Sequence, residues 1–181
     1  SATAFAIYNN IIIGVAFIWT YNFNNTVPGT GNVTATNGTV SGSATVTVIA
    51  GPLDHIIVTP DPANLQVGAT QQFTAAGYDV YNNIITGLSF AWATDVGTID
   101  ATGFFTAQTT PSTGIVTATS GAITGTANVI LTPGDVDHII VSPSPLTIVV
   151  GGTQQFTASA YDSYGNLING LTIAWATNVG T

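Results

Sequence analysis

Hydrophobic and polar residues alternate with a period of two in the strand-like segments of this chain, which is the period of β-strands. In the segment 88–94, Leu88, Phe90 and Trp92 fall on one face, and this predicts a half-buried strand. No segment of residues 53–135 carries a convincing 3.6-residue helical period. The pattern therefore predicts a fold made of strands.

Turn residues separate the strand segments about every 8 to 12 positions, a spacing typical of a β-sandwich. The run 65–79 breaks at Gly68 and then alternates, so that Phe73 faces one side and Gln72 and Thr74 face the other. A closed barrel is the alternative architecture. About seven short strands are expected, at residues 54–59, 65–79, 88–94, 97–100, 103–108, 114–120 and 123–131.

The chain repeats itself with a spacing of 83 residues. Residues 53–98 return as residues 136–181 with 29 of 46 positions identical, and residues 8–19 match residues 81–92. We therefore expect a window on a longer tandem array, in which a binding or catalytic site of the parent protein can lie outside the window. The predicted domains are the C-terminal part of a shortened unit in 1–52, a complete unit in 53–135 and the N-terminal part of a third unit in 136–181.

A polar turn recurs as YDVYNNIITG and YDSYGNLING in the second and third units. The pairs Asn82-Asn83 and Gly165-Asn166 fit a tight turn with positive φ at one or both central residues. Asp79 and Asp162 precede these pairs and are expected to accept backbone N–H bonds as an Asx-type cap. The turn is therefore interpreted as local architecture.

The first unit departs from the other two. It has Ala6 where they have an aspartate, and it lacks about ten residues between Trp19 and Val33 relative to the complete unit. We expect this unit to have lost an edge hairpin.

The order of the motifs resembles bacterial immunoglobulin-like domains, the Big-type modules of intimin- and invasin-like adhesins and of many bacterial and archaeal surface proteins. The motifs run DHIIVTP, VGATQQFTAAGYDVYNN, AWATDVGTIDATGFFTA, GIVTATSG and ITGTANVIL. The resemblance covers essentially the whole chain and implies an all-β fold of tandem immunoglobulin-like β-sandwich domains. It also implies a place outside the cell, in a rod, fibre or adhesin stalk.

Charge narrows the possible partners. The chain has eight acidic residues, all Asp, and no Lys or Arg, giving a formal net charge of −8. Nucleic acid is excluded as a partner because a polyanion needs basic residues to displace its counterions, and docking to anionic lipid is excluded likewise. The most apolar stretch, residues 11–19, is too short to span a membrane.

Some aspartates lie near the predicted domain boundaries. Some immunoglobulin-like surface modules bind calcium at domain junctions, and calcium takes six to eight oxygen ligands. The favoured interpretation is that these carboxylates are solvated and lie in turns and at strand edges. Apart from calcium, no cofactor is expected. The candidate calcium ligands are Asp54, Asp135 and Asp137.

Other recurrent residues fit structural roles better than chemistry. His55 and His138 occupy equivalent positions and are interpreted as hydrogen-bonding residues at a domain junction. One Trp per unit (Trp19, Trp92 and Trp175) is interpreted as sandwich core, with a sugar-binding platform as the alternative. No nucleophile, general base or phosphate-binding loop stands in a catalytic pattern, so we expect no enzyme.

Three Asn-X-Thr sequons lie in the first unit, at Asn24, Asn32 and Asn37, and are candidate glycosylation sites. The predicted function is an extracellular, cell-surface structural protein that builds a filament or rod. The expected partners are neighbouring immunoglobulin-like domains or copies of the chain in a polymer. The alternatives are an adhesin stalk whose binding domain lies elsewhere, and a carbohydrate-binding module.

Overall fold

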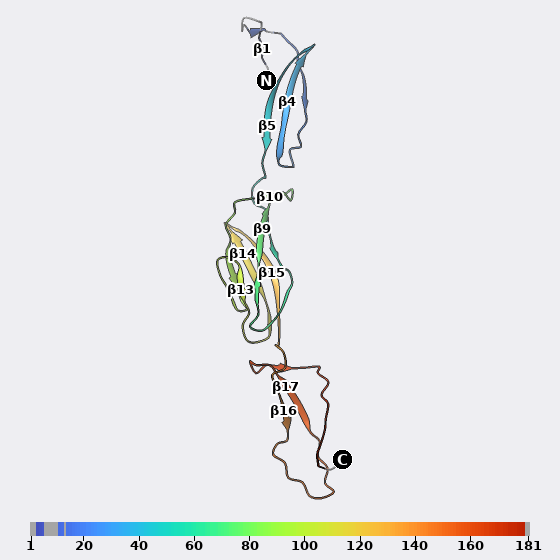
Figure 1. Ribbon diagram of the computed structural model, residues 1–181. Helices are drawn as coiled ribbons and strands as arrows, with labels where there is room; N and C mark the ends of the chain where they lie inside the picture. The colour runs from blue at the N-terminus through green and yellow to red at the C-terminus, as the bar shows by residue number, and fades with distance from the viewer. Residues whose placement is uncertain (1–2, 6–10, 13, 180–181) are drawn as a thin grey trace. The chain divides into compact units, whose positions relative to one another are not determined.

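A computed structural model describes residues 3–5, 11–12 and 14–179, and its described residues form strands and turns without a helix (Figure 1). The all-β prediction is confirmed. Ala6 lies outside the described residues. So do residues 8–10 and 13 of the segment 8–19 that matches the complete unit. No helix in the described part of the chain is long and apolar enough to cross a membrane.

The chain separates into two compact units, Ser1–His55 with Ala76–Leu88 and Ile56–Ala75 with Ser89–Thr181. The first compact unit thus combines the first sequence repeat with the polar turn of the second repeat. From here on, a unit is one of these two compact parts, and a repeat is one copy of the 83-residue sequence. The domain boundaries drawn from the repeat stay a prediction, and the two units are described separately.

Three antiparallel strands form the main sheet of the first unit, in the order β3-β4-β5. The β4–β5 hairpin turns at Gly38, whose φ of 59° lies in the left-handed region that glycine adopts without strain. A short pair, β1–β2, and the pairing of β10 with the end of β9 complete the unit. The bounds are β1 Ala4–Phe5, β2 Ile11–Ile12, β3 Ile18–Tyr21, β4 Gly29–Asn37, β5 Val40–Val48 and β10 Ile84–Ile85.

The second unit contains a four-stranded sheet in the order β11-β14-β15-β7. β14 and β15 form the long hairpin predicted across Gly121 and Ala122, with Ser120 opposite Ile123. β7 adds to β15 in parallel, whereas the other pairs are antiparallel. The bounds are β7 Ala63–Gln66, β11 Ala91–Thr94, β14 Ser112–Ser120 and β15 Ile123–Thr132.

Smaller sheets have the orders β12-β13-β8, β10-β9-β6 and β16-β17-β18. The predicted strand at 65–79 is interrupted twice and becomes β7, β8 and β9. Gly68, at φ 74°, makes the first interruption. The remaining bounds are β6 His55–Thr59, β8 Thr70–Gln72, β9 Thr74–Tyr78, β12 Thr98–Ile99, β13 Phe104–Thr106, β16 His138–Ser142, β17 Thr157–Tyr161 and β18 Leu167–Ile168.

The core of the second unit is built from Phe and Val. Phe73 and Phe105 are fully buried and meet edge to face, with ring centroids 5.8 Å apart. Val116 on β14 and Val129 on β15 are also fully buried. Each such side chain contributes roughly 1.5–3 kcal/mol by leaving water.

The tryptophans do not form this core, contrary to the sequence interpretation. Trp19 and Trp175 are 50% and 56% exposed, and Trp92 is half-buried. The Trp92 ring lies over Gly103, where an added Cβ would come within 3.0 Å of it. The ring therefore covers the edge of the sandwich, while Phe73 and Phe105 fill its centre.

Candidate functional site

The polar turn after β9 is built around a buried carboxylate, that of Asp79, which is 1% exposed. Its Oδ1 accepts hydrogen bonds from the backbone N–H groups of Tyr81 and Asn83, both at 2.9 Å. Asn82 has a φ of 62°. The predicted Asx-type cap with positive φ at the turn is confirmed.

The same carboxylate also holds the chain segment that joins the first repeat to the second. Oδ2 of Asp79 accepts a 2.8 Å hydrogen bond from the backbone N–H of Gly51. The side-chain nitrogen of Asn83 donates to both Asp79 oxygens, at 3.1 and 3.0 Å, and to the carbonyl of Thr26 at 2.8 Å. One turn therefore binds both the linker and a loop of the preceding repeat.

An equivalent arrangement recurs 83 residues later. Asp162 is 0% exposed and accepts backbone bonds from Tyr164 at 2.9 Å, Asn166 at 2.8 Å and Gly134 at 2.9 Å. The Asn166 side chain donates to the carbonyl of Thr109 at 2.8 Å. We call each of these arrangements a junction clamp: the buried Asp, the Asn four residues later, the linker Gly and the Thr carbonyl of the preceding repeat.

A third contact supports the second junction clamp. The Tyr164 ring lies so close to Gly68 that an added Cβ would be 2.5 Å from its Oη and 3.1 Å from its Cζ. Because Gly68 also has a φ of 74°, both the backbone and the neighbouring ring favour glycine there. The ring of this turn tyrosine thus contacts the preceding repeat.

Burial alone raises the pKa of the Asp79 carboxyl, but hydrogen bonds outweigh it and lower that pKa from 3.8 to about 2. The donors are the Asn83 side chain and the backbone N–H groups of Gly51, Asn83 and Tyr81. The pKa of Asp162 is lowered to about 2 by the equivalent donors. Both groups are thus buried anions stabilised by amide donors, in a chain without Lys or Arg.

The three candidate calcium ligands lie near the junctions but form separate contacts. Asp54 Oδ2 lies 3.0 Å from His55 Nδ1, and Asp137 Oδ2 lies 2.9 Å from His138 Nδ1. Asp135 accepts a hydrogen bond from the Gln66 side chain at 3.0 Å. Among the described residues, no group of three or more His or Asp is placed to hold a metal ion. Calcium binding stays a prediction.

The two histidines stack on tyrosines at the same place in their repeats. The ring centroids of His55 and Tyr78 are 5.4 Å apart, and those of His138 and Tyr161 are also 5.4 Å apart. Each His therefore sits between an Asp and a Tyr beside its junction clamp, in keeping with the interpretation as a hydrogen-bonding junction residue.

The three sequon asparagines are exposed. Asn24 Oδ1 accepts hydrogen bonds from the backbone and hydroxyl of Thr26 at 2.9 and 2.7 Å, and the Asn37 side chain donates to the Ala16 carbonyl at 2.8 Å. For Asn32, the bond recorded is from its backbone N–H to Asn22 at 2.7 Å. Glycosylation stays a prediction.

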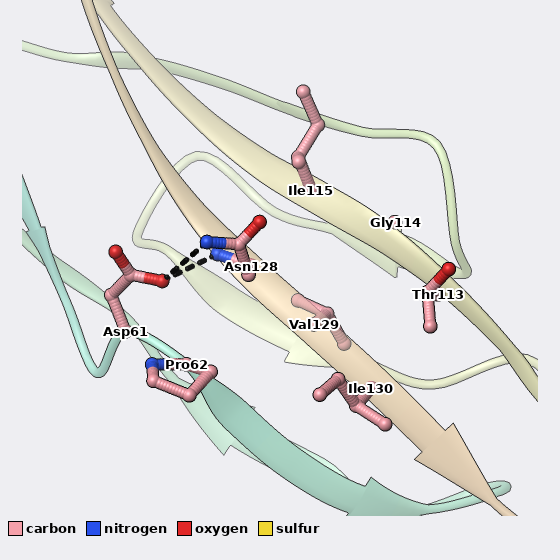
Figure 2. A pocket seen from close by; sticks show the side chains of 8 residues that line it. All are labelled: Asp61, Pro62, Thr113, Gly114, Ile115, Asn128, Val129 and Ile130. Carbon is pink, nitrogen blue, oxygen red and sulfur yellow. Dashed lines mark hydrogen bonds between the residues drawn. The ribbon is translucent and has the colours of Figure 1, made fainter.

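A groove of about 560 Å³ lies beside β15 (Figure 2). Asp61 is the one titratable residue in its lining, and its Oδ1 accepts from the backbone and side-chain nitrogens of Asn128, at 2.7 and 3.0 Å. The third repeat has Ser144 at the position of Asp61, and the first repeat has Thr45 at the position of Asn128. Asp61 thus ties the loop after β6 to β15, and this bond belongs to the complete repeat.

Sequence reasoning found the Asp cap but missed its reach across the junction. The available signal was the joint recurrence of Gly51 with Asp79 and of Gly134 with Asp162, both 28 residues apart. Such a spacing is informative only when the linker is known to pass the turn, which follows from the fold.

No protein-family model matches the chain. Over 153 residues it is 31% identical to Ice-binding protein 1 of Shewanella frigidimarina, a match that covers 82% of this chain and 17% of that protein. The chain thus spans about one sixth of the length of this relative.

Solved structures with similar architecture include the Escherichia coli adhesin FdeC. Its TM-score is 0.52 at 20% identity, with 80% of this chain and 54% of that chain covered. InvD of Yersinia pseudotuberculosis gives a TM-score of 0.47 at 21% identity, with 92% and 65% covered. The likeness to FdeC is a likeness of fold. The chain therefore has an all-β, immunoglobulin-like fold similar to that of this adhesin.

Proposed function

We propose that the chain is a structural spacer of an extracellular, cell-surface protein, in which junction clamps hold successive immunoglobulin-like repeats in a fixed arrangement. The observation that carries the proposal is the recurrence of the clamp: Asp79 and Asp162 each bind the turn of their own repeat and the linker glycine before it. A rod requires such a joint at each junction.

Hydrogen-bonded joints make a tandem array stiffer than flexible linkers would. A Gly- and Ser-rich linker behaves as a random coil, whereas these linkers contain Pro52 and Pro133 and donate a backbone N–H to a buried carboxylate. Bending at a clamp would expose the carboxylate and break the Asn bond to the preceding repeat. Leaving such polar groups without partners is costly.

The adhesin-stalk alternative is compatible with the same clamps. It is favoured by the match to Ice-binding protein 1, because that match leaves most of the length of the relative outside the shared region. In this reading the binding domain belongs to another part of the parent protein. Adsorption of the 181-residue chain itself to ice would contradict both the spacer and the stalk.

Small-angle X-ray scattering of the 181-residue chain tests the spacer function. We expect the double variant Asp79→Ala/Asp162→Ala to have a smaller maximum dimension and a more flexible profile than the unmodified chain, with the same circular dichroism spectrum. Asp61→Ala is the matched control, because it removes one carboxylate away from the clamps. Superimposable profiles for all three proteins would refute the proposal.

A further inference from the structure

The groove beside β15 lies on the outward face of the complete repeat and combines a carboxylate with two partly exposed isoleucines (Figure 2). β14 and β15, which carry most of its lining, are the two inner strands of the order β11-β14-β15-β7, so each has a neighbour on both sides. Val116 and Val129 are fully buried on the core side of these strands, whereas Ile115 and Ile130 are 39% and 38% exposed on the other side. The groove is therefore part of the outer surface of a sheet whose inner strands are all paired.

The Asp61 carboxylate stands at one side of the groove and is held there through one of its oxygens. Its Oδ1 accepts hydrogen bonds from the backbone and side-chain nitrogens of Asn128, at 2.7 and 3.0 Å. Among the described residues, no hydrogen bond is made to Asp61 Oδ2 or to the side-chain oxygen of Asn128. Figure 2 shows both of these oxygens pointing away from the Asp61–Asn128 bonds. The groove thus presents two fixed hydrogen-bond acceptors, one of them on a carboxylate.

The two isoleucines lie close to these acceptors. In the pairing of β14 with β15, Ile115 is directly opposite Asn128, and Ile130 is the next residue of β15 on the same face. Side chains directly opposite each other have Cβ atoms about 4.5–5.5 Å apart, and successive residues on one face of a strand are about 7 Å apart. A ligand that reaches the Asp61 carboxylate along β15 therefore passes over apolar surface.

The outward side chains of the groove are not required to build its hairpin. The first repeat forms the equivalent β4–β5 hairpin in the same register. It keeps the Gly and Val that face the core, but it has polar residues at the two isoleucine positions. The replacements are Asn32 for Ile115, Thr45 for Asn128 and Thr47 for Ile130, and the third repeat has Ser144 for Asp61. The chemistry of the groove belongs to one repeat, whereas the scaffold beneath it is shared.

We propose that this groove binds an arginine side chain of a basic partner protein. The guanidinium donates to Asp61 Oδ2 and to the side-chain oxygen of Asn128, while the methylene stem packs on the two isoleucines. Arginine suits this combination because its planar fork carries five N–H donors, is more weakly hydrated than an ammonium, and ends a long apolar stem. The inference goes beyond the spacer function and does not depend on it, since no residue of the second junction clamp lines the groove.

Charge determines which partner supplies this arginine. The 181 residues include no Lys or Arg, so a second copy of this chain has no such side chain to offer. The formal net charge of −8 attracts a basic protein and repels an acidic one. The occupant is therefore an arginine-bearing segment of a different protein.

A titration followed by NMR of the backbone amides tests the site. The probe is a blocked pentapeptide with one arginine between glycines, added to the 181-residue chain at physiological salt. We expect the largest shifts at Ile115, Asn128 and Ile130. Peptides with lysine, or with citrulline as the neutral isostere of arginine, should bind at least about 5-fold more weakly, because each loses part of the charged fork.

Three variants separate the groove from the net charge of the chain. Asp61→Asn removes the charge but keeps an oxygen that can accept from Asn128, and it should raise the dissociation constant about 10- to 150-fold, the loss of a hydrogen bond to a charged group. Asp137→Asn is the matched control, because it removes the same charge from the same unit outside the groove. Ile130→Thr introduces the residue of the first repeat and should raise the dissociation constant about 3- to 10-fold by removing apolar surface under the stem.

Equal dissociation constants for Asp61→Asn and Asp137→Asn would overturn the proposal, because the attraction would then be one of net charge alone. Equal affinities for the arginine and lysine peptides would overturn it as well, and so would the absence of shifts at the groove amides with millimolar arginine peptide. If calcium chloride at the concentration of the peptide reproduces the shifts, the groove is a cation site and the proposal is wrong.

Discussion

Replacing Asn166 by Ala tests a junction clamp without changing charge. The Asn166 side chain donates to the carbonyl of Thr109 at 2.8 Å and to Asp162 Oδ2 at 2.9 Å, so the variant loses both bonds. The bond to the neutral carbonyl alone contributes about 0.5–1.5 kcal/mol. This is a lower bound, because the bond to the carboxylate is lost as well.

Amide hydrogen exchange of Gly134 is the assay, because its N–H donates to Asp162 across the junction. A loss of about 0.5–1.5 kcal/mol makes local opening, and hence exchange, about 2- to 13-fold faster. Amides of β14 and β15 should keep their protection, since the sandwich core is untouched.

Asn169→Ala is the matched control for this prediction. Asn169 lies three residues further along the same turn region, is exposed, and has no side-chain hydrogen bond among those found in the described residues. Equal exchange at Gly134 in the two variants would refute the assignment of Asn166 to the clamp.

Three further outcomes follow. The pKa values of Asp79 and Asp162 fall from 3.8 to about 2 on folding, so their stabilisation is present above about pH 4 and lost as pH falls through about 2. The protection of the linker-glycine amides against hydrogen exchange, relative to an unfolded chain at the same pH, should therefore decrease in that window. Protection that does not change with pH would contradict this prediction. Phe73→Ala should lower the free energy of unfolding by about 3–5 kcal/mol in urea titrations, because Phe73 is fully buried. Phe104→Ala should lower it by about 1 kcal/mol or less, because Phe104 is 43% exposed. Similar losses in the two variants would contradict the assigned core. If the junction carboxylates bind calcium, excess EDTA should lower the melting temperature, and an unchanged melting temperature would remove that prediction.

Local rules were sufficient for much of the fold. The hairpin at Gly121 and Ala122 follows from two alternating runs around a turn signal, and the exposed and buried positions of β15 alternate as the sequence indicates. The Asx-type turn at Asp79 follows from its side chain and the Asn82-Asn83 pair. Each of these features depends on residues close together in the chain.

Packing across the sandwich could not be derived in this way. The Trp in each repeat resembles a core residue by its alternation, yet Phe73 and Phe105 occupy the centre and Trp92 lies over Gly103. Alternation shows which residues share a face. Which of them reaches the centre depends on how the second sheet is placed.

The reach of the clamp was hidden for a similar reason. Gly51 and Thr26 precede Asp79 and Asn83 by 28 and 57 residues, and both donate or accept through the backbone, which side-chain patterns do not record. The linker had to be placed beside the turn before the contacts could be recognised.

Pulsed dipolar spectroscopy across the second junction tests the central claim most directly. The chain has no Cys, so spin labels at Thr124→Cys and Ser142→Cys, two exposed sites on either side of the junction, are unique. We predict one narrow distance distribution, which Asp162→Ala broadens and Asp61→Ala leaves unchanged. Equally broad distributions in all three proteins would show that the buried carboxylate does not fix one repeat to the next.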